Sequence, residues 1–300
     1  MNQGLWFAVA AYGLWGFLPI YWKLLNHVPS FQILLHRMVW SLGFLLILLL
    51  VRSDWQWLKT ILSERKTLTT YFFASLLLAC NWGIYIWAVN ANFIVETSLG
   101  YFISPLVSVF VGVLFFRERL RKSQWLAVGV AALGVLVLSF VYGRLPWIAL
   151  SLAFSWNVYA ALKKLAPLSS LRGLALETAI LFAPALATLL YLQNVSGTSA
   201  GSVDVSTVAL LIGSGVVTAT PLICFTAAAK RLPLTILGMM QYLAPTIQLF
   251  IGIFIYNEFF DSSRLLGFAI IWASLIIFSL ETLNHQRRLR QTKDYKLKKT

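Results

Sequence analysis

Long apolar runs separated by short polar segments make up nearly the whole chain. A hydrocarbon core ~30 Å thick requires about 20 apolar residues in each helix that crosses it. Transmembrane β-strands would instead alternate apolar and polar positions over about ten residues. The pattern therefore predicts an all-α polytopic membrane protein with ten transmembrane helices. The expected spans are 4–22, 31–51, 71–90, 97–116, 124–142, 145–162, 171–193, 207–229, 234–256 and 265–283.

The polar segments between these runs differ in their content of Lys and Arg. Twenty of the 24 basic residues follow the second, fourth, sixth and eighth spans or lie in the tail at 284–300. The alternate segments hold only Lys23, Arg144 and Arg264. Cytoplasmic loops of membrane proteins carry such an excess. Both termini are therefore predicted to be cytoplasmic, with the basic tail near an anionic membrane surface.

Composition agrees with a membrane location and argues against other classes. Hydrophobic residues make up 59% of the chain and charged residues 11%, which is too few to cover the surface of a soluble domain. The net charge of +14 does not form a basic stripe with interleaved aromatic residues, so nucleic-acid binding is not expected. Cys80 and Cys224 lie singly in apolar runs, without the spacing of a metal or redox site. No metal or cofactor is predicted.

Two apolar segments of the chain resemble each other at an offset of 140 positions. Residues 101–118 read YFISPLVSVFVGVLFFRE, and residues 241–258 read QYLAPTIQLFIGIFIYNE. At an offset of 141, Trp15 likewise corresponds to Trp156. The identical pairs in the two segments are Pro105 and Pro245, Phe110 and Phe250, Gly112 and Gly252, and Glu118 and Glu258.

The position of this likeness indicates an inverted repeat. It relates the fourth span to the ninth, so the chain divides into two sets of five spans. Because five is odd, the second set enters the membrane from the opposite side. The predicted units are a first repeat at 1–143, an inverted second repeat at 144–283, and a cytoplasmic tail at 284–300. Secondary transporters use this plan repeatedly, although a channel or an enzyme could retain such a duplication without using it.

Pro105 and Pro245 lie where an uninterrupted helix would otherwise cross the membrane. Proline removes one backbone hydrogen bond and bends a helix. Such a break is tolerated where neighbouring groups or a water-lined cavity satisfy the freed carbonyl. Each proline is therefore either a static kink or a hinge that lets the ends of its span move.

Arg37 and Glu177 are the charged residues well inside predicted spans. At a rise of 1.5 Å per residue each lies about 9 Å deep, Arg37 from the outer face of the membrane and Glu177 from the inner face. In a core of ~30 Å an ion pair between them is not expected. Each either fixes helix packing or contacts a substrate or a coupling proton. Glu177 is the candidate if a proton gradient drives the protein.

Aromatic and amide side chains gather near the middle of several spans. A pocket built from them suits an uncharged or weakly polar organic ligand, although any aromatic residue could instead anchor or pack a helix. The candidate substrate-path residues are Tyr12, Trp15, Asn81, Trp82, Tyr85, Tyr101, Trp156, Asn157, Gln241 and Tyr242.

Five stretches of the chain carry a resemblance to a known family, namely WAVNANFIVETSLGYFISPLVSVFVG (87–112), FRERLRKSQWLAVGVAALGVLVL (116–138), CFTAAAKRLPLTILGMMQYLAPT (224–246), LLHRMVWS (34–41) and LALETAILFAP (174–184). They resemble RarD-type members of the EamA family, within the drug/metabolite transporter superfamily, and the likeness runs over nearly the whole chain. The resemblance implies a carrier of ten helices in a 5+5 inverted repeat, located in the bacterial inner membrane. It also implies export of small metabolites or drugs.

These observations predict a secondary active transporter of small molecules, a permease of the plasma membrane. The sequence has no GxxxxGK[ST] motif for ATP binding. It also has no HExxH and no GxSxG motif, so an enzyme is not predicted. The alternative is a membrane-embedded channel, sensor or enzyme that lacks a recognisable motif.

Overall fold

A computed structural model describes residues 2–52, 55, 57–58, 61, 64–90, 94–142, 147–196, 204–256, 266–267 and 269–281. Within these residues every regular element is a helix. The helices are α1 (Asn2–Lys23), α2 (Ser30–Val51), α4 (Arg65–Asn90), α5 (Ile94–Phe116), α6 (Lys122–Tyr142), α7 (Trp147–Leu165), α8 (Ser170–Ser196), α9 (Val205–Ala229), α10 (Leu234–Met240), α11 (Leu243–Phe254) and a last apolar helix at Ala269–Glu281.

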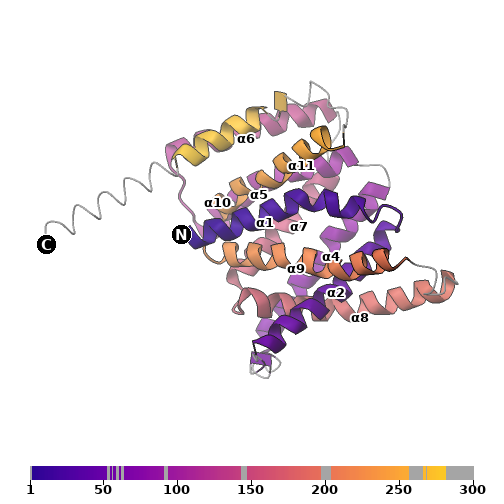
Figure 1. The fold of residues 1–300 in the computed structure, drawn as a ribbon. Helices are drawn as coiled ribbons and strands as arrows, with labels where there is room; N and C mark the ends of the chain where they lie inside the picture. Colours follow the sequence, from indigo (N-terminus) through magenta and orange to yellow (C-terminus); the bar gives the residue numbers. More distant parts are fainter. Residues whose placement is uncertain are drawn as a thin grey trace.

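The helices coincide with the predicted spans, and α10 and α11 together occupy the ninth. Figure 1 shows most of them running in roughly the same direction, with α6 along one edge of the bundle and α2 and α8 along the opposite edge. The prediction of an all-α polytopic membrane protein is confirmed. Within the described residues, five helices are long and apolar enough to cross a membrane, namely Gln3–Lys23, Ser30–Val51, Arg65–Tyr85, Ser170–Asn194 and Val205–Ala229.

Helices that the predicted repeat makes equivalent pack against each other. α2 contacts α8, and α5 contacts α10. Ser274 Oγ donates a hydrogen bond to Ala127 O at 2.7 Å, which joins the last helix to α6. These pairings agree with a 5+5 inverted repeat. The boundary between the predicted halves at 143–144, Glu258 and the tail at 284–300 lie outside the described residues.

The two halves accommodate their shared proline differently. α5 runs unbroken through Pro105. In the second half, α10 ends at Met240 and α11 begins at Leu243, so that Pro245 lies in the first turn of α11. A first-turn N–H has no partner within its own helix, so proline costs little there. The structure therefore interrupts the ninth span and leaves the fourth continuous.

Two glycines allow helices on either side of the bundle centre to approach closely. A Cβ on Gly238 of α10 would lie 2.9 Å from the carbonyl oxygen of Pro105 in α5. A Cβ on Gly215 of α9 would collide with the backbone of Trp40 in α2 and would lie 2.7 Å from Ser41 N. Only glycine fits at such a backbone contact. These crossings set the spacing of the helices that surround the site.

Candidate functional site

A cavity of about 430 Å³ lies in the middle of the bundle. Its walls come from α1, α2, α4, α5, α7, α9 and α11, together with Gln241 at the break between α10 and α11. Both predicted halves of the chain therefore contribute to it. Its volume falls within the roughly 300–1,000 Å³ that is typical of small-molecule sites.

Aromatic side chains form a large part of the cavity wall. Tyr12, Trp15 and Trp22 recur at helical spacing along one face of α1, and all three line the cavity. Trp15 meets Trp156 of α7 edge to face, with ring centroids 5.4 Å apart. The offset of 141 positions had paired these two tryptophans. Two tryptophans that the predicted repeat makes equivalent therefore meet at the cavity.

Among the described residues of the cavity wall, the charged one is Arg37 of α2. Its Nε donates a hydrogen bond to Thr218 Oγ1 of α9 at 2.9 Å. Its guanidinium carbon lies 4.8 Å from the ring centroids of both Trp22 and Trp82, within the range of cation–π attraction. Within the part of the chain that the structure describes, no carboxylate forms an ion pair with Arg37.

The amide side chains of the cavity wall are hydrogen-bonded to the protein. Asn81 Nδ2 donates to two acceptors on α7, both at 2.9 Å. Gln241 accepts from Ser104 and donates to Ser108 of α5, both at 2.8 Å. Gln248 Nε2 donates to a backbone carbonyl of α1 at 3.0 Å. These amides hold helices together around the cavity.

Most of the predicted substrate-path residues lie in the cavity wall, but Asn157 and Tyr242 do not. Asn157 is 1% exposed and bonds to Ser104 of α5, whereas Tyr242 is fully buried and its hydroxyl donates to Phe102 O at 3.1 Å. A role in binding stays a prediction for all of them. The predicted residues that line the cavity are Tyr12, Trp15, Asn81, Trp82, Tyr85, Tyr101, Trp156 and Gln241.

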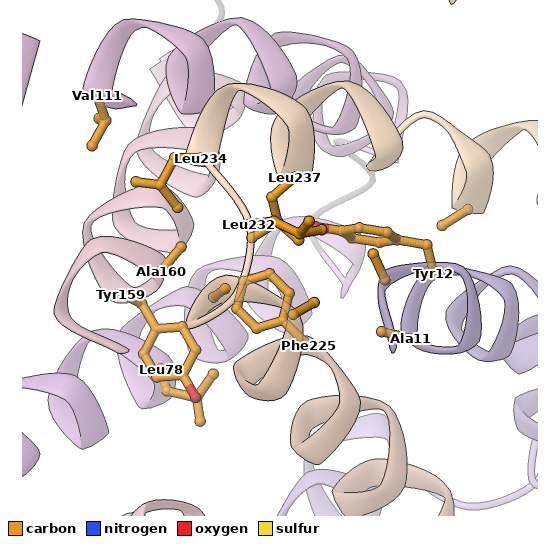
Figure 2. Close-up of a cluster of buried hydrophobic side chains, with 14 of the residues drawn as sticks. Ala11, Tyr12, Leu78, Val111, Tyr159, Ala160, Phe225, Leu232, Leu234 and Leu237 are labelled. Carbon is orange, nitrogen blue, oxygen red and sulfur yellow. The ribbon is translucent and has the colours of Figure 1, made fainter. Parts of the chain in front are cut away.

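A cluster of buried apolar side chains fills the bundle on one side of the cavity, at the end where α1 and α10 begin. Figure 2 shows Phe225 between Tyr159 and Tyr12, with Leu232 and Leu237 close by. The ring centroid of Phe225 lies 6.3 Å from that of Tyr12 and 6.4 Å from that of Tyr159. We call this end the α10 end. The apolar plug comprises Ala8, Ala11, Tyr12, Ala74, Leu78, Val111, Tyr159, Ala160, Phe225, Ala228, Ala229, Leu232, Leu234, Leu237 and Ala244.

Glu118 joins the two halves of the chain at the α10 end. Its carboxylate accepts hydrogen bonds from Leu234 N at 2.7 Å and from Thr235 N at 3.0 Å. A carboxylate at a helix N-terminus is favoured by the partial positive charge of the free N–H groups. Lys164 Nζ lies 3.7 Å from the same carboxylate and donates to Leu232 O at 2.5 Å. Glu118, Lys164 and the first N–H groups of α10 therefore form a polar contact beside the plug, which we call the Glu118 clasp.

Further cations gather at the α10 end. Lys230 follows α9, and its Nζ donates to Ala166 O at 2.6 Å. Burial and, after it, the charges of Lys163 and Arg231 lower the pKa of Lys230. This is the end of the bundle that the distribution of Lys and Arg predicts to be cytoplasmic.

Glu177 does not line the cavity, and its partner was not anticipated from the sequence. Its Oε1 lies 2.6 Å from Lys163 Nζ, and the two side chains are 0% and 1% exposed. Tyr159 O–H donates to Oε2 at 3.1 Å. The predicted sixth span, 145–162, ends one residue before Lys163, but α7 extends to Leu165 and includes it. The pair ties α7 to α8 beside the plug.

Trp22 is a second residue that the sequence analysis missed. It lies seven positions after Trp15, so the two share a helix face, and this spacing could have identified it. Lys163 gave a weaker signal, because hydropathy alone does not decide whether a lysine at the end of a span lies inside the helix.

Comparison with known proteins places the chain among membrane transporters. The model of the EamA-like transporter family matches residues 2–140. The chain is 44% identical to Protein RarD of Streptomyces exfoliatus, over 96% of this chain and 92% of that protein. It is 43% identical to the uncharacterized transporter YojE of Bacillus subtilis, over 95% and 96%.

More distant similarities extend the comparison. The chain is 29% identical to the chloramphenicol-sensitive protein RarD of Pseudomonas aeruginosa, over 92% of this chain and 93% of that protein. A solved crystal structure superposes with a TM-score of 0.70 at 17% identity, covering 93% of this chain and 98% of the other. At that identity the structural match supports the fold alone.

Proposed function

Because the chain belongs to the EamA-like transporter family and is a multi-pass membrane transporter, we propose that it is a secondary active exporter of small metabolites or drug-like molecules. In this proposal it works by alternating access across the bacterial inner membrane. The observation that carries the proposal is a central cavity whose walls come from both halves of the chain and which the apolar plug closes at one end. An exchange of open and closed ends between inverted halves would move a solute from one side to the other.

The proposed orientation places both termini and the α10 end in the cytoplasm. Basic residues concentrate at this end, as the positive-inside rule requires. Trp22, near the end of α1, and Ser30, at the start of α2, both line the cavity. They lie on the side of the bundle away from the α10 end. In this orientation the described conformation is closed to the cytoplasm by the plug and the Glu118 clasp.

The proposed energy source is an ion gradient, because no ATP-binding motif occurs in the sequence. Coupling to protons through Glu177 stays a hypothesis. A proton on Glu177 would leave the ammonium of Lys163, 2.6 Å away, without its buried counter-charge. Protonation of this carboxylate would therefore have to be accompanied by movement of α7 relative to α8.

Counterflow in proteoliposomes tests the proposed function. The purified protein is reconstituted, the vesicles are loaded with an unlabelled compound, and uptake of the same labelled compound is followed. The panel should contain amino acids, organic acids, organic amines and chloramphenicol, since one relative is named for sensitivity to it. We expect saturable accumulation of at least one compound, because a carrier exchanges bound solute across the membrane.

The same assay separates the alternatives. Protein-free liposomes are the control for leakage. Flux that rises linearly with concentration, without counterflow, would indicate a channel, and release of a chemically altered compound would indicate an enzyme. Either result would overturn the proposal, as would the absence of counterflow for the whole panel.

The break in the ninth span leads to a prediction about the hinge. Pro245→Ala restores an N–H in the first turn of α11, where the carbonyl of Gln241 already accepts from Ala244 N at 3.3 Å. We expect it to favour a continuous helix across the break and to slow counterflow several-fold. Pro105→Ala, in the unbroken α5, is expected to change the rate less. Equal rates for both variants and the original protein would leave only a static kink.

A further inference from the structure

The unpaired charge of Arg37 identifies the chemistry of the ligand that the central cavity would accept. The guanidinium lies in the cavity wall, on α2 and well inside the membrane-spanning bundle. A charge at such depth is costly unless it is paired or faces a water-filled cavity. The buried carboxylate of Glu177 is already paired with Lys163. Within the described residues the positive charge of Arg37 is therefore uncompensated by any carboxylate.

Arg37 retains free hydrogen-bond donors. A guanidinium has five N–H groups in a rigid planar fork. The protein uses Nε, which donates to Thr218 Oγ1 at 2.9 Å, and among the described residues no other hydrogen bond of Arg37 is formed. Trp22 and Trp82 lie 4.8 Å from the guanidinium carbon and hold it in place without occupying its N–H donors. The Nη groups are the donors that match a carboxylate through two parallel bonds.

The remaining polar groups of the wall do not offer an equivalent partner for a cation. Among the residues that the structure describes, the lining includes neither Asp nor Glu. The amides of Asn81 and Gln241 are bonded to neighbouring helices. The hydroxyl-bearing rings of Tyr85 and Tyr101 are 38% and 44% exposed and face the cavity, but they carry no negative charge. A ligand amine would meet Arg37 without a counter-charge.

The rest of the wall suits an apolar body. Trp15, Trp22, Trp82 and Trp156 all line the cavity. Aromatic walls around a few polar groups are typical of sites for organic molecules. Aromatic residues alone had suggested an uncharged ligand, and the placement of Arg37 among them changes that expectation.

We propose that the cavity binds organic anions, with a carboxylate or similar oxyanion held by Arg37 and an aromatic or other apolar body held against the tryptophans. The inference rests on the proposed function in that it names the substrate class of the same site. It makes Arg37 the specificity-determining residue, and it disfavours amines. Zwitterions such as amino acids are disfavoured too, because their ammonium has no acidic partner among the described lining residues.

Equilibrium binding to the purified protein in detergent tests the proposal independently of transport. The probes form a matched set at neutral pH, namely 3-phenylpropionate, 3-phenylpropionamide, phenylalanine and 3-phenylpropylamine, and binding is followed by calorimetry. We expect 3-phenylpropionate to bind roughly 10- to 100-fold more tightly than the amide. The reason is that its carboxylate would accept charge-assisted hydrogen bonds from Arg37, which are stronger than those that a neutral amide accepts. Phenylalanine and the amine should bind more weakly than the anion.

Variants assign the preference to Arg37. Arg37→Gln should abolish the difference between 3-phenylpropionate and its amide, and Arg37→Lys should retain part of it because the charge remains. Arg231→Gln is the matched control, since Arg231 lies over Phe7 at 5.2 Å, outside the cavity lining, and should leave the preference unchanged. Thermal unfolding of each variant checks that it is folded.

The outcomes decide the proposal. Equal affinity for anion and amide, tighter binding of the amine, or no binding of any probe would overturn it, as would a folded Arg37→Gln variant that keeps the preference. If Arg37→Gln does not fold, the original protein and Arg37→Lys decide by the same comparison. Counterflow of an uncharged compound alone would leave the transporter proposal standing while this one fails.

Discussion

Replacing Lys163 with Met is expected to destabilise the protein by about 3–5 kcal/mol, the range found when one partner of a buried ion pair is removed. The reason is that Glu177 would keep its carboxylate in a fully buried site, 0% exposed, without its counter-charge. Tyr159 would still donate one hydrogen bond to it at 3.1 Å, which offsets only a part of the loss. Equilibrium unfolding in mixed detergent measures the change in the free energy of unfolding.

A double-mutant cycle shows whether the two charges are coupled. Glu177→Gln alone should also destabilise the protein, because it leaves the ammonium of Lys163 buried and unpaired. The Lys163→Met/Glu177→Gln variant should recover much of the loss, since it buries no charge. Additive effects of the two substitutions would contradict the pair. Lys164→Met is the control: Lys164 is 21% exposed and 3.7 Å from Glu118, so we expect a loss of about 1 kcal/mol or less.

Replacing Gly215 with Ala is expected to produce the second large effect, on both stability and binding. The added Cβ would collide with the backbone of Trp40 and lie 2.7 Å from Ser41 N, so α2 and α9 would have to separate. Overpacking of this kind costs about 1–3 kcal/mol. The hydrogen bond from Ser41 Oγ to Gly215 O, at 3.3 Å, would be strained by the same movement.

The consequence for binding follows from the helix geometry. Arg37 lies one turn from Ser41 on α2, and Thr218 lies one turn from Gly215 on α9. Separation of the two helices would therefore weaken the 2.9 Å bond that positions Arg37. We expect weaker binding of 3-phenylpropionate in Gly215→Ala, measured by the same calorimetry.

Gly129→Ala provides the matched control for Gly215→Ala. Gly129 lies in α6, and a Cβ there meets nothing within 4 Å. Alanine is favoured over glycine in a helix interior, by up to about 1 kcal/mol. This variant should be as stable as the original protein or slightly more so. A Gly215→Ala variant that behaved in the same way would show that α2 and α9 tolerate a larger spacing.

The positions of the helices along the chain could be predicted, because the bilayer imposes a length on every span. Only helices or closed barrels satisfy all backbone polar groups in lipid, and runs that are continuously apolar do not show the alternation of barrel strands, so a helix was expected for each run. The pairing of Trp15 with Trp156 was also visible as an offset of 141 positions, and their rings meet at 5.4 Å. These features are local in the sequence or depend on its internal symmetry.

Predictions about individual side chains fared less evenly. Arg37 could be recognised as a buried charge, but its bond to Thr218 joins residues 181 positions apart. Glu177 was recognised too, yet its partner Lys163 had been placed in a loop because the sixth span was ended one residue before it. Asn157 and Tyr242 are of the same residue types as Asn81 and Tyr12 in the cavity wall, but their side chains bond to a neighbouring helix.

The repeated proline shows the same division between sequence and structure. Pro105 and Pro245 occupy equivalent positions in two similar segments, yet α5 is continuous and the other helix breaks between Met240 and Leu243. Two segments that share this proline but differ at most other positions therefore take two backbone courses, and the shared proline alone does not decide between them.

The sequence by itself determined the class of the protein and the approximate limits of its helices, because these depend on hydropathy along one dimension. It also predicted the duplication, from comparison of the chain with itself. Only the tertiary structure decided which faces of the helices meet, and therefore that Arg37 faces the cavity while Glu177 is neutralised outside it. The rotation of each helix about its axis depends on packing against all the others. In spans that are apolar on every side, periodicity carries little information about that rotation.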